Sequence, residues 1–140
     1  MGALLIAMIL HGGPNYTWKA VISAPVIWEA AENSREDPYL IAALAWVESR
    51  WNPDIVSRTN DCGFMQTSAR WSEYSCDELK DLTTGIRVGI GSIKYWRGRF
   101  GNDWLCHYNS GNACYRRSRN YARKIRRVHR RLLRFGRMER

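Results

Sequence analysis

An amphipathic pattern near the C-terminal end places the strongest constraint on how this chain can fold. Apolar residues recur there at spacings of four and three, which is one face of an α-helix; they are Tyr121, Ile125, Val128, Leu132 and Phe135. The other faces carry Arg123, Arg126, Arg127, Arg130, Arg131 and Arg134. Such a helix must bury its apolar stripe against other elements. The sequence therefore predicts a basic C-terminal helix, residues 116–140, docked on a core.

The length and composition fit one folded domain. A chain of 140 residues can build one compact core and is too short for two. Its 45% hydrophobic and 12% aromatic content is typical of a folded protein and argues against disorder. Because no segment shows strong apolar alternation, we expect a single mainly α domain over residues 1–140.

One internal helix has a clear start and end. Asp37 can cap a helix whose first position is Pro38, because the fixed φ of proline suits the first turn. This helix should run to about Ser49 and stop before Pro53. Further helices are expected over residues 82–97 and 104–108, whereas residues 54–80 look rich in loops.

Two other helical features carry specific expectations. The helix around Trp18 to Glu32 should fall into two pieces, with Ser23 capping the second, because Pro25 is tolerated only in a first turn. Within residues 82–97, three glycines indicate the close approach of a neighbouring helix; they are Gly85, Gly89 and Gly91.

The N-terminal stretch MGALLIAMIL is apolar but is no clear cleavable signal peptide. No basic residue precedes the apolar run, and no convincing cleavage site follows it. It is also far shorter than the ~20 residues that span a bilayer. We interpret residues 1–22 as a packed N-terminal element, and an uncleaved export signal is the alternative.

The four cysteines favour two short disulfide-closed loops. Their spacings suggest the pairs Cys62–Cys76 and Cys106–Cys114, although four cysteines allow three pairings and free thiols in a reducing compartment are the alternative. A zinc site is disfavoured because there is no CxxC motif and His107 directly follows Cys106. We expect no metal and no cofactor.

The positive charge is concentrated in one segment. The net charge is +9, and residues 116–140 alone hold twelve basic residues and one acidic residue, so the preceding part is slightly acidic. Clustered arginines favour a polyanionic partner. On composition alone, a nucleic-acid-binding protein is therefore a rival interpretation.

Glu48 is an unusual residue for its position. It shares a helix face with the apolar residues Ile41, Leu44 and Ala45 and lies in the last turn. Burial and the negative end of the helix dipole both disfavour its charged form, which would raise its pKa toward that of a general acid. The alternative from spacing alone is an ion pair with a basic partner such as Arg50.

Four motifs occur in an order that resembles a known superfamily. They are ES at 48–49, GFMQ at 63–66, YN at 108–109 and Tyr121. This order is similar to that of the soluble lytic transglycosylases and goose-type lysozymes, and the resemblance covers about residues 24–129. It implies a lysozyme-like helical domain with a loop-rich substrate cleft and cleavage of peptidoglycan.

The resemblance also implies roles for individual residues. Glu48 would be the catalytic acid and Ser49 a hydroxyl that holds the substrate and the surroundings of the acid. The remaining residues would bind the glycan; they are Gly63, Phe64, Met65, Gln66, Tyr108, Asn109 and Tyr121, with the Tyr121 hydroxyl reaching toward Glu48. Their structural alternatives are core packing for Met65 and Tyr108, a turn for Asn109 and stripe packing for Tyr121.

Departures from the pattern of the superfamily bear on the reaction. Phe64 replaces the usual Leu, and His107 replaces the usual Ala and would place a titratable side chain beside the cleft. Goose-type enzymes carry an Asp where this chain has Ser68, so Asp54 and Asp61 are the other acids close by in sequence. Hydrolysis with inversion needs a second carboxylate. We therefore expect a transglycosylase, with goose-type hydrolysis as the alternative.

The biological setting follows from these expectations. The partners would be peptidoglycan strands and, through the basic helix, an anionic envelope surface to which residues after about Arg131 contribute. We expect no nucleic acid and a monomer. The enzyme would act in the periplasm or cell wall after secretion or release from the host cytoplasm, as in a phage endolysin or virion-associated lysin. A catalytically dead peptidoglycan-binding protein is a further alternative, against which Glu48 argues.

Overall fold

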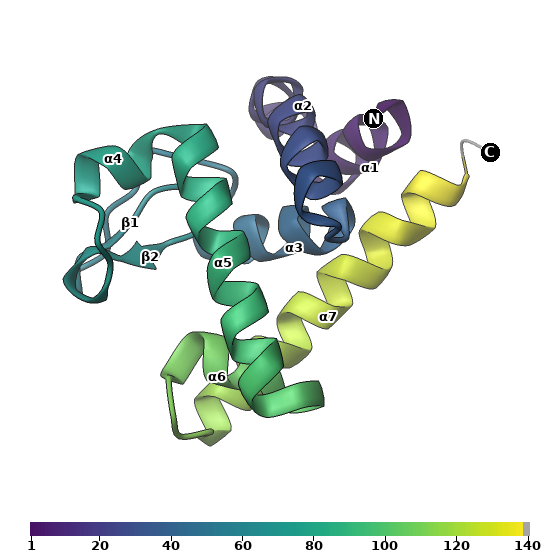
Figure 1. Cartoon of the computed structure of the whole chain (residues 1–140). Helices are drawn as coiled ribbons and strands as arrows, with labels where there is room; N and C mark the ends of the chain where they lie inside the picture. The colour runs from purple at the N-terminus through teal and green to yellow at the C-terminus, as the bar shows by residue number, and fades with distance from the viewer. Residues whose placement is uncertain (139–140) are drawn as a thin grey trace.

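The structure, a computed structural model, describes residues 1–138 and is mainly helical (Figure 1). Its α-helices are α1 (Gly2–Gly12), α2 (Thr17–Ser34), α3 (Pro38–Ser49), α4 (Cys76–Lys80), α5 (Leu82–Phe100), α6 (Trp104–Ser110) and α7 (Arg116–Arg137). The strands β1 (Asp61–Cys62) and β2 (Thr67–Ser68) and three short 3-10 turns, η1 (Pro14–Tyr16), η2 (Ala69–Trp71) and η3 (Gly101–Asp103), complete the described chain. The prediction of one compact, mainly α domain is confirmed.

The last helix docks as its pattern predicts. Figure 1 shows α7 crossing the molecule, and it packs against α1, α3 and α6. Ile125, Val128 and Leu132 are buried, and the arginines of the other faces are exposed. Gly136 is also buried, and a side chain at this position would collide with Tyr39 of α3. The two ends of α7 therefore belong to the same core.

Helix α3 has the expected bounds. The Asp37 carboxylate accepts a hydrogen bond from the backbone N–H of Tyr39 at 2.8 Å, and Pro38 occupies the first turn. At the other end, Arg50 adopts a left-handed conformation with φ of 54°, which terminates the helix. The buried Trp51 then folds back and its indole N–H donates to the carbonyl of Ala42 at 2.9 Å.

Helix α2 is continuous through Pro25, so the prediction of two pieces is wrong. Pro25 has no N–H to donate to the carbonyl of Val21, and both residues are exposed, so water can reach this carbonyl. Ser23 does not act as a cap, because its hydroxyl donates to the carbonyl of Lys19 within the same helix at 2.7 Å. Exposure of this face makes the missing hydrogen bond tolerable.

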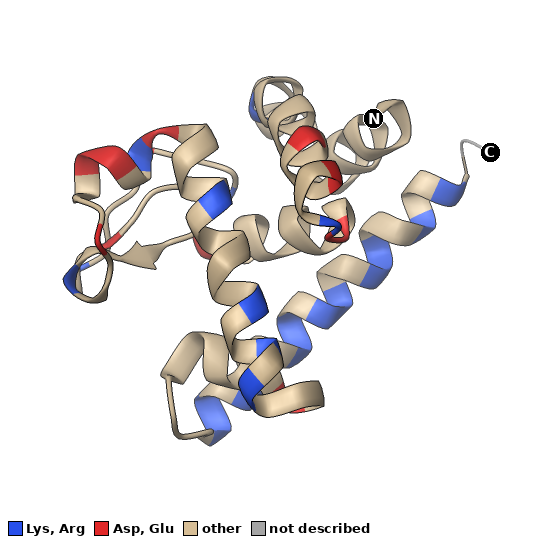
Figure 2. Cartoon of the chain, viewed as in Figure 1, with Lys and Arg blue, Asp and Glu red and all other residues tan. Residues whose placement is uncertain are grey.

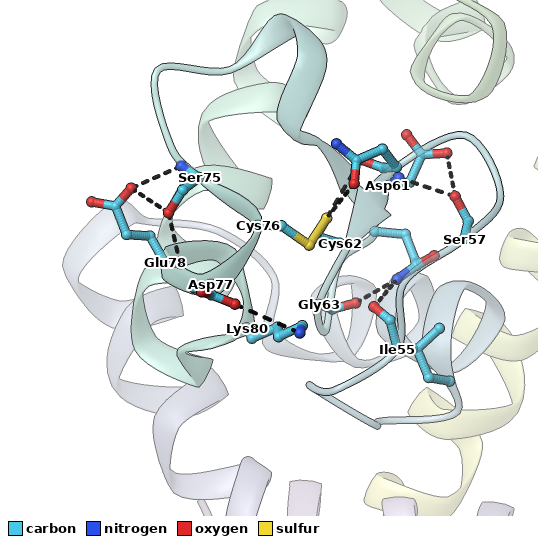
Figure 3. Close-up of a disulfide and its surroundings, with 12 residues drawn as sticks. Ile55, Ser57, Asp61, Cys62, Gly63, Ser75, Cys76, Asp77, Glu78 and Lys80 are labelled. Atoms are coloured by element: carbon cyan, nitrogen blue, oxygen red, sulfur yellow. Dashed lines mark hydrogen bonds and ion pairs between the residues drawn. A yellow bond between two sulfur atoms is a disulfide. The ribbon is translucent and has the colours of Figure 1, made fainter.

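The segment between α3 and α5 contains a small sheet that the sequence pattern did not reveal. Strands β1 and β2 are antiparallel, with Asp61 opposite Ser68 and Cys62 opposite Thr67. Two-residue strands are too short to show alternation. The disulfide Cys62–Cys76 joins β1 to the start of α4, as predicted (Figure 3). Ser75 caps α4 by a reciprocal pair of hydrogen bonds with Glu78.

Of the three α5 glycines singled out above, two allow close approaches, but not to a helix packed along α5. A Cβ on Gly89 would lie 2.6 Å from the Met65 side chain, and one on Gly85 would lie 2.6 Å from the carbonyl oxygen of Leu79 at the end of α4. Gly91 has open space around it. The glycines therefore accommodate the loop that precedes β2 and the turn into α5.

The N-terminal residues form a packed helix, as expected. Leu4, Ala7 and Met8 of α1 are buried, and His11 packs edge-on against Trp46 with ring centroids 4.8 Å apart. Burial, together with the nearby Arg131 and Arg50, lowers the pKa of His11 to about 4, so this ring is neutral at pH 7. Across residues 1–138, no helix combines the length and apolar character that a membrane span requires.

Candidate active site

Three helices bring two tyrosines to Glu48. Glu48 is the penultimate residue of α3, and the Tyr121 hydroxyl from the second turn of α7 donates a hydrogen bond to its carboxyl Oε1. Tyr108 of α6 is close enough for the charge of Glu48 to raise its pKa, although burial is the larger cause of that rise. Residues 60 and more positions apart in sequence thus meet at one carboxyl.

The surroundings of Glu48 favour its protonated form. Burial raises its pKa from 4.5 to about 7, and the nearby negative charge of Asp61 acts in the same direction. The hydrogen bond from Tyr121 and the charge of Lys124 partly oppose this rise. The Glu48 side chain is still partly exposed, so a carboxylic acid at this position can give its proton to a bound molecule.

The proposed ion pair between Glu48 and Arg50 is absent. Arg50 instead places its guanidinium 4.5 Å from the centroid of the Trp46 ring. Within the described residues, the ion pairs are Lys80–Asp77, Arg97–Glu36 and His129–Asp37, and none includes Glu48. Spacing alone could not decide whether the Glu48 carboxyl forms an ion pair. In the structure it is shielded and has no ionic partner among residues 1–138.

The GFMQ loop, residues 63–66, is attached to the end of α3 through Ser49, and its apolar side chains are buried. Phe64 is fully buried and Met65 is 1% exposed, so both are core residues in this structure. Gly63 has φ of 78°, and a side chain there would collide with the carbonyl of Leu79. The loop therefore presents mainly its backbone and Gln66 for any contact with a ligand.

Ser49 and Gln66 hold this loop in place. The buried Ser49 hydroxyl donates to the carbonyl of Phe64 at 2.8 Å and accepts from the backbone N–H of Asn52 at 3.1 Å. The Gln66 side-chain amide donates to the carbonyls of Ile55 and Gly63, each at 2.9 Å. Because the Ser49 hydroxyl is buried and engaged, the expected contact of Ser49 with substrate is not available here.

The remaining expected residues differ in their surroundings. Asn109 on α6 is exposed, and Tyr108 before it is partly buried against Trp104. His107 does not face Glu48: it is buried, stacks on Phe100 with ring centroids 3.5 Å apart, and its Nδ1 lies 2.7 Å from the carbonyl oxygen of Gly111. The expectation of a titratable ring beside the substrate is therefore wrong, because aromatic packing holds His107 inside.

Of the two nearby acids that the sequence indicated, only Asp61 affects the pKa of Glu48, and sequence reasoning missed the second charged neighbour, Lys124. Asp54 is instead exposed on the preceding loop. Asp61 accepts a hydrogen bond from the Ser57 hydroxyl at 3.0 Å (Figure 3). Lys124 follows Tyr121 by three residues, a helical spacing that places both on one side of α7 and could have indicated this neighbour.

The second disulfide links α6 to the segment that connects α6 to α7. Cys106 of α6 is bonded to Cys114, as predicted, which ties the helix of Tyr108 to the segment leading into α7. Among residues 1–138 there is no group of three or more His, Cys, Asp or Glu side chains that could hold a metal ion.

Solved structures share the fold of this chain. The lytic transglycosylase Slt of Pseudomonas aeruginosa, solved as an inactive mutant, matches 81% of this chain with a TM-score of 0.64 and 16% identity. The 70-kDa soluble lytic transglycosylase of Escherichia coli matches 80% with a TM-score of 0.57 and 19% identity. A complex of the 70-kDa soluble lytic transglycosylase with bulgecin A matches 80% with a TM-score of 0.55 and 20% identity.

These matches define a lysozyme-like helical domain as the class of fold. The chain spans only 24%, 23% and 20% of the length of those three proteins. Residues 25–129 match the family described as the transglycosylase SLT domain, and the chain belongs to this family. A search of curated proteins found no match.

Proposed function

We propose that this protein is a lytic transglycosylase that cleaves the β-1,4 bond between N-acetylmuramic acid and N-acetylglucosamine in peptidoglycan. One observation carries the proposal: in a member of the SLT family, Glu48 has a pKa raised to about 7 and is held by Tyr121. A carboxylic acid that is partly protonated at neutral pH can act as a general acid and, after losing its proton, as a general base.

The reaction needs only this one carboxyl. Glu48 gives its proton to the glycosidic oxygen while the bond from that oxygen to C1 of the muramic acid breaks, and the N-acetyl carbonyl stabilises the positive charge at C1. The 6-hydroxyl of the same sugar then bonds to C1 and returns its proton to Glu48. The product has a 1,6-anhydromuramic end, and no water is consumed.

The other site residues support this step in different ways. Tyr121 would orient the Glu48 carboxyl, and Tyr108 and Asn109 would contact the glycan from α6. We assign Ser49, Phe64 and Met65 a positioning role, because all three are buried and fix the loop between the strands. Gln66 keeps its side-chain oxygen as an acceptor, since its amide nitrogen already donates to Ile55 and Gly63.

The product end group tests the reaction. Purified peptidoglycan is digested with the protein and the muropeptides are separated and weighed by mass spectrometry. We expect anhydro ends, each lighter than a reducing end by one water. Reducing ends alone would overturn the transglycosylase assignment and establish a hydrolase.

Hydrolysis of the same bond is a second candidate, favoured by the proximity of Asp61. Its charge affects the pKa of Glu48, so it is the acid to consider for activating water. Its carboxylate is, however, engaged by Ser57 and Thr59 of its own loop. Asp61→Asn should therefore leave the yield of anhydro ends within about twofold, with the exposed Asp54→Asn as the matched control. Reducing ends in the wild-type digest that disappear in Asp61→Asn and persist in Asp54→Asn would instead favour hydrolysis assisted by Asp61.

We further propose that α7 binds an anionic surface of the cell envelope. Its eleven Arg and Lys residues line one side of the molecule in Figure 2, and none of them pairs with a carboxylate within residues 1–138. The site of action would be the periplasm or cell wall. A monomeric state and the absence of a nucleic-acid partner remain predictions, as does an origin in a phage.

Truncation would be a poor test of this surface. Leu132 is fully buried and Gly136 packs on Tyr39, so a chain that ends after Arg131 would lose part of its core as well as charge. Replacing exposed arginines by glutamine keeps the core and removes only charge. We expect such variants to bind isolated envelope less tightly, with a weaker dependence on salt.

A further inference from the structure

The connection between α1 and α2 presents an apolar surface to solvent. Trp18, Val21 and Ile22 are 59%, 50% and 57% exposed, and their spacing places them on one face of α2. Leu10, at the end of α1 that leads into this connection, is 50% exposed. We call these four residues the apolar tip. Large apolar side chains that gather at one end of a helical pair are unusual on a protein surface without a partner.

The apolar tip and all of α7 lack acidic side chains, and the first acid of α2 is Glu29, two turns beyond Ile22. The first 28 residues contain no Asp or Glu, and Lys19 is their only Lys or Arg. Arg50 and Arg131 lie close to His11, which is the residue after Leu10, and both act on its charge. Arg127 and Arg134 lie one turn before and after Arg131 on the exposed side of α7. In Figure 2, α1 carries neither blue nor red segments, whereas the neighbouring α7 carries blue segments along its length.

The apolar tip and the C-terminal end of α7 are both additions to the family domain. The family match covers residues 25–129, so the apolar tip, Arg131 and Arg134 lie outside it. Yet α1 packs directly along α7, and the buried Leu4, Met8 and Leu132 belong to one core. The two additions are therefore joined in space, and neither contains a residue of the candidate active site.

We infer that the apolar tip and the arginines beside it form a membrane-docking surface whose partner is a bilayer of anionic lipids. Trp18 and its apolar neighbours would enter the boundary between headgroups and acyl chains, while the arginines contact the phosphates of the headgroups. Charge complementarity selects this partner, since acidic residues are missing from the apolar tip and cations flank it. Docking would be peripheral, as no described helix can span a membrane.

This inference goes beyond the proposed function and can be tested without catalysis. The full chain is sedimented with vesicles of phosphatidylcholine and with vesicles of equal parts phosphatidylcholine and phosphatidylglycerol. We expect at least about tenfold tighter binding to the anionic vesicles, because each basic residue near an anionic surface adds roughly a fivefold factor before screening. Equal binding to both vesicles, or none, would overturn the inference and leave the glycosidase proposal unaffected.

Two sets of substitutions separate the apolar and the charged contributions. Trp18→Gln with Ile22→Gln should weaken binding about tenfold and leave its salt dependence unchanged, because apolar burial is insensitive to salt. Arg127→Gln, Arg131→Gln and Arg134→Gln together should weaken binding by a similar factor and flatten the salt dependence. All five positions carry side chains that are exposed, so the fold should be retained, as far-UV circular dichroism would check.

Matched controls lie elsewhere on the surface. Trp71→Gln with Tyr95→Gln removes two aromatic side chains that are 81% and 57% exposed, and Arg58→Gln, Arg70→Gln and Arg99→Gln remove three exposed charges. Neither control should change vesicle binding by more than about twofold if the surface is specific. Equal losses in the controls and the test variants would mean that only overall charge and hydrophobicity matter, which contradicts a defined surface.

Two other partners would give distinguishable results. If the apolar tip joins two copies of this chain, analytical ultracentrifugation should show a dimer that Trp18→Gln with Ile22→Gln dissociates, and vesicle binding should not depend on those residues. If the arginines serve a nucleic acid, the full chain should bind a DNA duplex more tightly than anionic vesicles at the same salt concentration. Either result would overturn the assignment to a bilayer.

Discussion

The two ends of α3 each hold a carboxyl group against α7, and the pKa values of the two groups move in opposite directions. At the N-terminal end, burial opposes the charge of Asp37, but hydrogen bonds from His129 and the backbone outweigh it and lower the pKa. At the C-terminal end, burial outweighs the single hydrogen bond from Tyr121 and raises the pKa of Glu48. Helices α3 and α7 thus provide one environment that favours a charged carboxylate and one that favours a protonated carboxyl.

The difference shows what distinguishes a structural carboxylate from a candidate acid. Asp37 lies at the positive end of the helix dipole and its Oδ2 lies 2.7 Å from Nε2 of His129, so its charge is well compensated. Glu48 lies at the negative end and has a neutral hydroxyl as its hydrogen-bond partner. Burial therefore prevails at Glu48, whereas at Asp37 hydrogen bonds from His129 and the backbone prevail over burial.

Removing the acid should have the largest effect. Glu48→Gln keeps the size of the side chain and removes its proton chemistry, so cleavage of peptidoglycan should fall by about 10³-fold or more. Release of soluble muropeptides measures the activity. Asp37→Asn is the matched control at the other end of α3 and should keep at least about half of the activity. Retained activity in Glu48→Gln would disprove its role as the acid.

The same substitution should stabilise the fold at alkaline pH. The folded-state pKa of Glu48 is raised from 4.5 to about 7, so its stabilising contribution is fully present below 4.5 and lost as pH rises through 7. At pH 8, Glu48→Gln should therefore unfold at a higher urea concentration than the wild type. Its free energy of unfolding should be greater by up to about 3 kcal/mol. The gain should vanish at pH 4, and a gain that does not depend on pH would point to a different cause.

Loss of the tyrosine partner should shift the pH profile of cleavage. The hydrogen bond from Tyr121 lowers the pKa of Glu48, so Tyr121→Phe should move the alkaline limit of activity to higher pH. Activity at the optimum should fall about tenfold, because the carboxyl is less well oriented. Rates measured between pH 5 and about 9 test both effects, and an unchanged alkaline limit would separate Tyr121 from the proton transfer.

Substitutions of Asp37 should change stability and not activity, and their effect should be the smallest of those predicted here. Asp37→Ala removes the cap of α3 and the partner of His129, which should cost about 1 to 2 kcal/mol in urea unfolding at pH 7. Asp37→Asn keeps a capping oxygen and should cost less. In the wild type, the contribution of Asp37 is present above pH 3.8 and lost as pH falls through its lower folded-state pKa. A stability difference between Asp37→Asn and the wild type that grows as pH falls below 3.8 would contradict this account.

Patterns within one helix were the part of the structure that the sequence predicted well. Asp37 with Pro38 indicated the start of α3, and the stripe through Ile125 and Leu132 indicated the docked face of α7. The short spacings of the cysteines indicated both disulfides. These features depend on neighbours in sequence, which is why periodicity and capping rules reach them.

The failures have a common physical origin in contacts between distant residues. Helix α2 tolerates Pro25 because its exposed side lets water satisfy the freed carbonyl, and His107 turns inward because Phe100 offers a stacking surface. Ser49 is occupied by the carbonyl of Phe64, fifteen residues further on. None of these outcomes depends on residue type alone, because each is decided by the neighbour that packing supplies.

By itself, the sequence determined a mainly helical domain, a cationic last helix and Glu48 as the one carboxyl worth considering as an acid. The resemblance to the superfamily implied that Tyr121 reaches toward Glu48, but spacing left an ion pair with Arg50 open. Only the tertiary structure decided between these two partners, and only it showed that α1 lies along α7 so that apolar and cationic surfaces adjoin. The physical reason is the same in both cases. Burial and charge act through space, and the chain must fold before residues 73 positions apart can form a hydrogen bond.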